Sequence, residues 1–221
     1  MKDSLGDRMK NNYENRTRYM LPRRTYTIIR VDGKAFHTFT KGLPRPICPT
    51  LTAAMDLTAN ALVKEIQGAK FAYTQSDEIS VLITDFDNEQ TEAWFNGNLQ
   101  KMASVAASIA TAEFNKYFTI VRDKPALFDA RVFTIPDRTE VANYFIWRQK
   151  DCVRNSLQMF ARTYFSHKDL QNKSSSEIHE MLHSIGLNWA HLPGTFKNGR
   201  ISGTGLTGEA PNFIIDKTMI P

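Results

Sequence analysis

The sequence predicts an α+β protein in which the elements follow one another as β-α-β-β-α-β, a ferredoxin-like antiparallel sheet with helices on one face. Three observations predict it. A buried-strand pattern ends at Asp32, a hairpin pattern occupies about 70–84, and a further strand pattern at 129–135 follows a long amphipathic helix. A mostly helical C-terminal appendage, 137–221, follows this unit.

In the first part of the chain, helix and strand patterns are separated by residues that favour loops. Residues 5–20 are polar and predict a helix, and about 24–32 predict a strand. Three prolines make 38–50 a loop, because proline fixes φ and lacks an N–H donor. A helix follows from Pro49 or Thr50 to Gly68. Its apolar residues fall at helical spacing at Leu51, Met55, Ala59, Leu62 and Ile66.

The next elements complete the β-α-β-β-α-β order. Two apolar arms at about 70–84 flank Gln75-Ser76-Asp77-Glu78 and predict a β-hairpin. A helix is expected over about 90–117, and the strand at 129–135 is stopped by Pro136. We therefore expect a first domain at 1–136, made of this unit and its N-terminal helix.

The remaining chain, 137–221, is expected to pack on that domain as a helical and Gly-rich appendage. Asp137 is a suitable cap for a helix reaching about 163. Ser174 and Glu177 form a capping-box pattern for a shorter helix ended by Gly186. Phe213-Ile214-Ile215 predicts a β-like segment in the tail.

Composition narrows the class of protein. The 221 residues are 42% hydrophobic, enough for a sizeable core, and no apolar run approaches the roughly 20 residues that span a bilayer. The N-terminus has no apolar signal core, and two cysteines make neither a metal cluster nor a disulfide framework. These features predict a cytoplasmic protein that does not associate with a membrane. The net charge of +5 permits a polyanionic partner.

Two acidic residues stand where apolar strands end. Asp32 follows the first strand pattern, and Asp77 lies between the hairpin arms. If the hairpin lies beside the first strand, the two carboxylates meet at one edge and repel unless cations lie between them. Hard oxygen ligands favour Mg²⁺, and two such ions can clamp a phosphoryl displacement. The pair therefore predicts the chemistry of a polymerase palm, although each residue alone is compatible with a solvated turn.

Two other motifs are weaker. His179-Glu180-Met181-Leu182-His183 matches the zinc-peptidase pattern, but no third ligand is evident and the helix is short. Gly203-Thr204-Gly205-Leu206-Thr207-Gly208 matches a dinucleotide-binding pattern, but Pro211 follows where a helix would have to start. We expect a loop or hairpin tip there.

Four ordered motifs carry a resemblance to a known family. They are Arg-Val-Asp-Gly-x-x-Phe-His at 30–37, Gln-Ser-Asp-Glu at 75–78, Phe-Asp-x-Arg-Val at 128–132 and Trp-Arg-Gln-x-Asp-Cys at 147–152. With these motifs the chain resembles the tRNA(His) guanylyltransferase superfamily of 3′-to-5′ nucleotide polymerases, over most of residues 5–160. The resemblance implies a polymerase-palm fold and a homotetramer, a dimer of dimers.

The resemblance also implies site residues. Two Mg²⁺ ions would be held by Asp32, Asp77 and the carbonyl of Gly33, with Glu78 as a further catalytic residue that supports the site. The implied nucleotide-binding residues are Lys34, Ala35, Phe36, His37, Arg45, Ser76 and Lys101. The expected RNA-binding residues are Arg148, Arg154, Lys197 and Arg200. Arg148 has the guanidinium geometry that binds phosphate with two hydrogen bonds.

One departure from the family pattern separates two branches. Enzymes that act on tRNA(His) carry His-Ile-Asn-Asn-Leu-Tyr-Asn after the Asp-Cys pair, and Val153 stands here in place of the leading His. The chain thus resembles the branch that repairs truncated tRNA by template-dependent addition to the 5′ end, with ATP, GTP or other nucleoside triphosphates as substrates. The alternatives are a non-templated guanylyltransferase acting on tRNA(His) and a catalytically silent RNA-binding module. A nucleotide cyclase ranks low, because a diguanylate cyclase would carry Gly-Gly-Asp/Glu-Glu-Phe at the hairpin.

Overall fold

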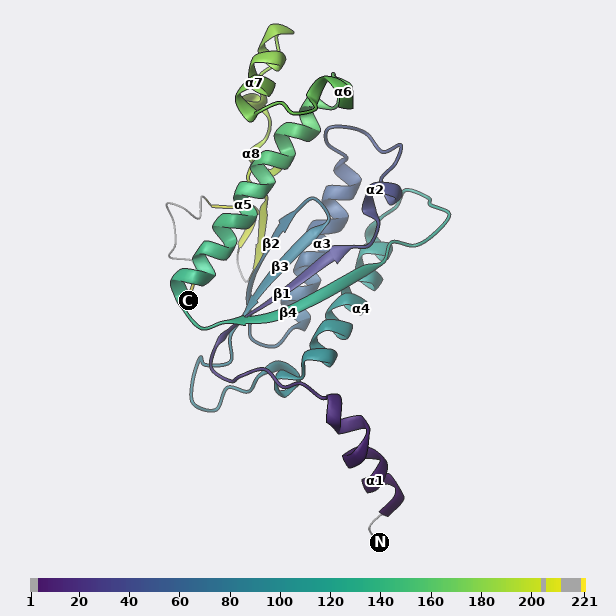
Figure 1. Ribbon diagram of the computed structural model, residues 1–221, viewed down its shortest axis with the longest axis vertical. Helices are drawn as coiled ribbons and strands as arrows, with labels where there is room; N and C mark the ends of the chain where they lie inside the picture. Colours follow the sequence, from purple (N-terminus) through teal and green to yellow (C-terminus); the bar gives the residue numbers. More distant parts are fainter. Residues whose placement is uncertain (1–3, 204–205, 212–219) are drawn as a thin grey trace.

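A six-stranded antiparallel sheet forms the centre of the computed structural model, which describes residues 4–203, 206–211 and 220–221 (Figure 1). Its strand order is β4-β1-β3-β2-β5-β6. The strands are β1 (Tyr26–Gly33), β2 (Ala69–Gln75), β3 (Glu78–Ile83), β4 (Phe128–Ile135), β5 (Arg200–Gly203) and β6 (Leu206–Glu209). The four strands expected from the sequence occupy one side of the sheet, and β5 and β6 extend it.

Helices α3 (Pro49–Glu65) and α4 (Leu99–Tyr117) cover one face of the sheet. Ile29 and Val31 of β1 face them and are completely buried. Alternate residues of a strand point to opposite faces, so Ile28 belongs to the core on the other side. The predicted ferredoxin-like α+β fold is thus confirmed.

The opposite face is covered by α5 (Arg138–Ala161), from the C-terminal part of the chain. Phe145 on this helix packs against Phe71, with ring centroids 4.9 Å apart. Tyr144 reaches Ser80 of β3, at 2.7 Å between the two hydroxyl oxygens. The sheet is therefore buried on both faces, and the C-terminal segment supplies both a covering layer and two strands.

The far end of α5 carries a small helical extension of its own. It consists of α6 (His167–Leu170), α7 (Ser175–Ser184) and η3 (Trp189–His191), after which α8 (Gly194–Lys197) lies beside the middle of α5. Figure 1 shows α6 and α7 beyond the upper end of the sheet. The predicted capping box is present: Ser174 Oγ accepts from Glu177 N at 3.3 Å, and Ser174 N donates to Glu177 Oε2 at 2.9 Å. It satisfies backbone groups that would otherwise lack partners at the helix start.

Three element boundaries differ from the sequence-based expectation. The long helix begins at Leu99 instead of about 90, because Phe95 and Asn96 have positive φ within η2 (Trp94–Gly97) and Asn98 caps the helix start. The N-terminal helix α1 (Ser4–Asn12) is shorter than predicted and is followed by η1 (Glu14–Thr17). A short helix, α2 (Phe36–Phe39), begins the expected 38–50 loop. The β-like segment expected at 213–215 lies outside the described residues.

Candidate metal and nucleotide site

Asp32 occupies the end of β1, in a row of three carboxylates across neighbouring strands. Its strand partners are Glu78 on β3 and Asp129 on β4. Paired residues point to the same face, so all three lie on the side covered by α5. Burial, followed by the charge of Glu78, raises the pKa of Asp32 above its usual value. The charged form of Asp32 therefore needs a nearby cation.

Asp77 lies in the turn between β2 and β3, beside the end of β1. Its carbonyl oxygen accepts a hydrogen bond from Gly33 N at 3.2 Å, which fixes the turn against the residue after Asp32. Burial raises the pKa of Asp77 to about 6; the hydrogen bond from Ser76 opposes this, and the charge of Asp32 adds to it. Within the described residues neither Asp32 nor Asp77 forms an ion pair. We call Asp32, Gly33 and Asp77 the metal edge.

Glu78 has the opposite environment, although it is the next residue. Its oxygens accept hydrogen bonds from Arg148 Nε at 2.8 Å and Arg148 Nη2 at 2.7 Å. Arg148 also binds Asp151 at 3.0 Å. The side chains of Glu78 and Arg148 are 10% and 8% exposed. We call Glu78, Arg148 and Asp151 the Glu78 cluster. Because its guanidinium is buried and already bound to carboxylates, Arg148 is not placed to contact RNA directly, which corrects the role expected from its sequence pattern.

Two arginines beside the metal edge, Arg30 and Arg131, lie within the family motifs, but the sequence pattern assigned neither of them a role in the site. Arg30 on β1 pairs with Arg131 on β4, two residues from Asp32 and from Asp129 along their strands and on the same face. The Arg30 Nε atom is buried and has no hydrogen-bond partner within the described residues. Both arginines lower the pKa of Asp32, although less than burial raises it. Identical charges on directly paired residues are unfavourable unless an anion lies between them, and this is the signal that could have identified the pair.

The residues of the metal edge fit a magnesium site by the chemistry of their donors. Mg²⁺ in nucleotide enzymes is bound by one or two carboxylates together with substrate phosphates and waters. Asp32 and Asp77 supply two carboxylates that form no ion pair with any described residue, and Gly33 adds a backbone carbonyl. A Cβ atom at Gly33 would lie 2.2 Å from the Phe36 ring, so only glycine fits between the strand and that ring. The described residues contain no group of three or more His, Cys, Asp or Glu side chains able to hold a metal ion, so the remaining ligands would have to come from substrate and water.

The predicted nucleotide-binding residues after Gly33 lead into α2. Lys34 and His37 are exposed. Ala35 has a φ of 54°, which turns the chain back toward the core. The Phe36 side chain is buried against Phe114, so only its backbone is available to a nucleotide. This segment therefore offers exposed polar groups directly beside the metal edge.

Lys101 lies elsewhere in the chain. It is in the first turn of α4, whose start is held to Leu21 through Gly97. The part of α4 that lies beside the metal edge is at Thr111. Thr111 accepts a hydrogen bond from Phe128 N, and Phe128 is the strand partner of Gly33. Ten residues of helix between Lys101 and Thr111 correspond to about 15 Å. Within one chain, Lys101 is not brought to the metal edge.

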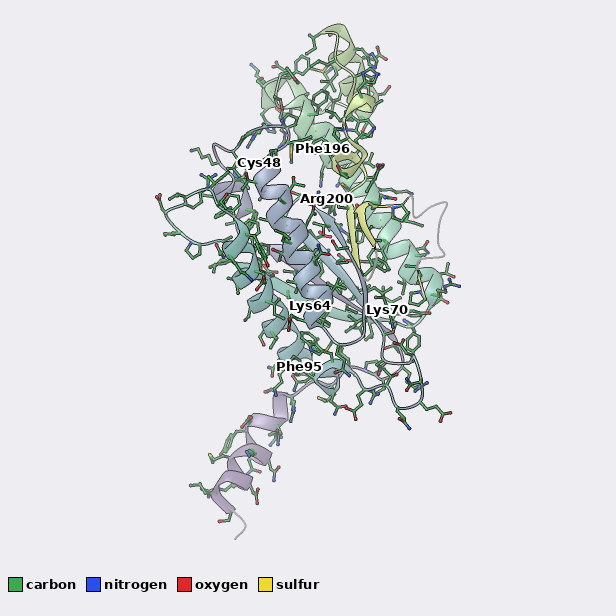
Figure 2. The ribbon with its side chains drawn as sticks, turned by 180° about the vertical axis from the view of Figure 1, so that it is seen from behind. Cys48, Lys64, Lys70, Phe95, Phe196 and Arg200 are labelled. Atoms are coloured by element: carbon green, nitrogen blue, oxygen red, sulfur yellow. The ribbon has the colours of Figure 1, made fainter. Side chains whose placement is uncertain are left out.

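A pocket of about 90 Å³ adjoins the β2–β3 turn and is lined in part by two of the predicted site residues, Ser76 and Arg200. Cys48 at the start of α3, Ser76, Asn155 on α5, Phe196 and Arg200 are among the residues that line it. Figure 2 labels Cys48, Phe196 and Arg200, which come from three separate segments. We call it the base pocket. Arg45 is exposed in the loop that leads to it.

The other expected RNA-binding residues have varied surroundings. Arg200 donates to Asp56, and its side chain is 11% exposed. Lys197 donates to the carbonyl of Ala190 at 2.6 Å. Arg154 is 67% exposed and pairs with Asp151. Of the four residues, Arg154 is the most accessible to a large ligand.

Both weaker motifs have structural explanations. His179 on α7 packs edge-on against Trp189, with ring centroids 5.6 Å apart, and the described residues around it include no group of side chains able to hold a metal ion. Gly203 and Gly208 lie on the antiparallel strands β5 and β6, where a dinucleotide fold would require a helix. The expected hairpin is observed in the described residues on either side of its tip.

Known proteins share the sequence pattern and the fold of this chain. The profile of the family described as tRNAHis guanylyltransferase matches residues 6–136. The chain belongs to this family. The tRNA(His) guanylyltransferase of Schizosaccharomyces pombe is 31% identical over 80% of this chain and 72% of its own length. That of Debaryomyces hansenii is 30% identical over 84% of this chain and 76% of its own length.

Solved structures of the family have the same fold. A bacterial tRNA(His) guanylyltransferase-like protein in complex with ATP has a TM-score of 0.93 and 42% identity, and the match covers 98% of this chain and 99% of that one. A bacterial protein of the same description in complex with GTP has a TM-score of 0.84 and 41% identity, covering 98% and 97%. The family membership and the nucleotidyltransferase class expected from the motifs are confirmed. Among the described helices none is long and apolar enough to cross a membrane.

Proposed function

We propose that this protein adds nucleotides to the 5′ end of truncated tRNA in the 3′-to-5′ direction, and that pairing with the opposite strand selects each nucleotide. The single observation that supports the chemistry is the metal edge, where Asp32 and Asp77 adjoin at two strand ends and have no ion-pair partner among the residues that the structure describes. Val153, which stands where the tRNA(His) enzymes carry His, favours the template-dependent branch.

The proposed reaction has two stages. The 5′-monophosphate of the RNA attacks the α-phosphate of ATP, forming an adenylylated 5′ end and releasing pyrophosphate. The 3′-hydroxyl of an incoming nucleotide then attacks the 5′ phosphate of the RNA and expels AMP. Positioning and charge stabilisation account for most of the rate in phosphoryl transfer, so the protein need not form a covalent bond.

Each group of residues has a distinct part in this scheme. Two Mg²⁺ ions bound at the metal edge would neutralise the triphosphate and lower the pKa of the attacking hydroxyl. Arg30 and Arg131 carry positive charge on the same face, where triphosphate oxygens can be bound. Glu78 acts as a positioning residue, because it holds Arg148 and packs beside Asp32.

The base pocket is suited to the base of the activating nucleotide. It adjoins Ser76, one residue before Asp77, so a base in the pocket leaves its phosphates near the metal edge. The lining combines an aromatic ring with polar side chains, as is usual for small-molecule sites. ATP and GTP are bound by the bacterial relatives, and we propose that this chain binds both as substrates.

The decisive experiment is extension of a 5′-truncated, 5′-phosphorylated tRNA with Mg²⁺, ATP and one nucleoside triphosphate at a time. We expect addition of the nucleotide that restores Watson–Crick pairing, whichever base is opposite. Equal addition of G opposite all four template bases would instead assign the tRNA(His) activity. Binding of tRNA without labelled AMP transfer would indicate a silent RNA-binding module.

A further inference from the structure

The N-terminal segment, residues 4–24, holds most of the net charge of the chain. It contains six of the 28 Lys and Arg residues and two of the 23 Asp and Glu residues, so its net charge is +4 out of +5 for the whole protein. The other 200 residues are almost neutral. We call residues 4–24 the basic arm. A charge concentrated in this way is the electrostatic footprint of a polyanionic partner.

The basic arm is exposed but attached to a fixed base. Every residue from Asp7 to Met20 is exposed, and α1 buries no side chain. Figure 1 shows α1 standing apart from the sheet and its helices. The base of the arm is held by Leu21 N to Gly97 O at 2.8 Å and by the ion pair of Arg23 with Asp85. The arm thus presents its side chains from a defined position.

Five of the six positive charges of the arm are not neutralised by the described residues, and Arg23 is the exception. In the part of the chain that the structure describes, the following side chains form no ion pair and no hydrogen bond: Arg8, Lys10, Arg16, Arg18 and Arg24. Tyr13 and Tyr19 are 66% and 67% exposed beside them. Free cations interspersed with exposed aromatic rings bind phosphates and stack on unpaired bases.

We propose that the basic arm contacts the phosphate backbone of the substrate RNA, away from its reacting end. This inference rests on the proposed function and adds a binding surface to it. The arm joins the sheet at the Tyr26 end of β1, and Asp32 lies six residues along the strand, about 20 Å away. The arm therefore holds the body of the RNA and does not touch the phosphate that reacts.

A second copy of this chain fits the arm less well. Two arms of charge +4 repel each other, and the nearly neutral remainder offers little excess acid to attract one. The larger apolar side chains of α1, Leu5 and Met9, share the helix with Arg8 and Lys10. Charge complementarity thus favours RNA, and self-association becomes an outcome of the test.

The test compares two variants with the same loss of charge. The arm variant carries Arg8→Gln, Lys10→Gln, Arg16→Gln and Arg18→Gln. The control variant carries Lys64→Gln, Lys124→Gln, Lys150→Gln and Lys168→Gln, at exposed positions on four other segments. Binding to 5′-truncated tRNA is measured by fluorescence anisotropy without nucleotides, between 50 and 200 mM salt, conditions over which phosphate contacts weaken steeply. Thermal unfolding followed by circular dichroism verifies that both variants fold.

For the arm variant we expect affinity to fall at least tenfold at 50 mM salt. The slope of log K against log salt should decrease by about 3, since each lost phosphate contact removes about 0.7 to 0.9. The control should change much less. At saturating tRNA the extension rate should be unchanged, because the arm lies away from Asp32. Tyr13→Ala with Tyr19→Ala should weaken binding several-fold with little change in the salt slope.

An unchanged slope in the arm variant, or an equal loss in the control, would overturn the inference. So would sedimentation showing that the arm variant loses self-association while it keeps its affinity for tRNA. Failure of the proposed function is distinguishable: a wild-type chain that binds tRNA through the arm but adds no nucleotide supports the arm and refutes only the activity.

Discussion

Asp77 and Glu78 are consecutive residues with opposite electrostatic environments. Asp77, at the metal edge, has no ion-pair partner within the described residues, and its pKa is raised to about 6. Glu78, in the Glu78 cluster, accepts two hydrogen bonds from the buried guanidinium of Arg148. Asp77 lies in the turn between β2 and β3, whereas Glu78 is the first residue of β3 and contacts Arg148 on α5.

This difference suits Asp77 to binding a ligand and Glu78 to supporting the structure around it. A buried carboxylate without a cation is costly to the folded chain unless a ligand provides the missing charge. A carboxylate already paired within the protein has no such need, and it serves to fix the position of its neighbours. We therefore propose that an external cation binds at the metal edge, and that the Glu78 cluster holds the edge in position.

The largest effect is expected at the metal edge. Asp32→Asn or Asp77→Asn should reduce single-turnover nucleotide addition by about 10³-fold or more, because each removes a carboxylate needed to hold the cations. Binding of tRNA should change little. The matched control is Asp129→Asn, in the same carboxylate row but on the edge strand. Near-normal rates in either variant would remove the assignment of the metal edge.

The Glu78 cluster should respond mainly in stability. Glu78→Gln removes the two-bond charge partner of the buried Arg148 guanidinium and leaves it only Asp151 among the described residues, which should cost about 3 kcal/mol of unfolding free energy. Urea unfolding measures this loss. Adding Arg148→Met to Glu78→Gln should recover part of it, since the stranded charge is then gone. A loss below about 1 kcal/mol for Glu78→Gln would show that the pair is not needed to hold the site together.

The pH dependence of stability should distinguish the two regions. In EDTA, the folded chain keeps a proton on Asp77 up to about pH 6, whereas the unfolded carboxyl releases it near its ordinary pKa of 3.8. Because the folded state binds more protons in this window, its stability should fall as pH rises from about 4 to 6. Asp77→Asn should flatten this slope.

Above pH 6, Mg²⁺ should restore the folding stability that is lost when Asp77 is ionised. At tenfold excess over its dissociation constant, Mg²⁺ bound only to the folded state adds about 1.4 kcal/mol. Thermal unfolding at pH 7.5 with Mg²⁺ and with EDTA measures this difference. The gain should be lost in Asp32→Asn and Asp77→Asn. An equal gain in wild type and Asp77→Asn would place the cation elsewhere.

The smallest effect is expected at the outer rim of the Glu78 cluster. Arg154 pairs with Asp151, but its side chain is 67% exposed. Exposed pairs are screened by water, so Arg154→Ala should change the unfolding free energy by about 0.5 kcal/mol or less. Urea unfolding should show nearly coincident curves. A loss as large as that of Glu78→Gln would mean that the cluster extends to the surface.

The local sequence determined most of the fold and part of the site. Strand patterns placed β1 through β4 within two residues, since the period of two and the flanking turns are local signals. The capping box at Ser174 and Glu177 was likewise readable, because both partners lie three residues apart. Asp32 and Asp77 could be identified because each is an acidic residue at the end of an apolar strand pattern. The hydrogen bond from Gly33 N to the Asp77 carbonyl joins those two ends.

The tertiary structure alone decided which charges face each other. Arg148 meets Glu78 across 70 positions, Arg30 aligns with Arg131 through strand register, and Lys101 lies at the wrong end of α4 for the metal edge. None of these placements follows from local pattern, because register and packing join segments far apart in the chain. Propensity and spacing are short-range properties, whereas the balance of charge around a carboxylate depends on every segment that folds against it.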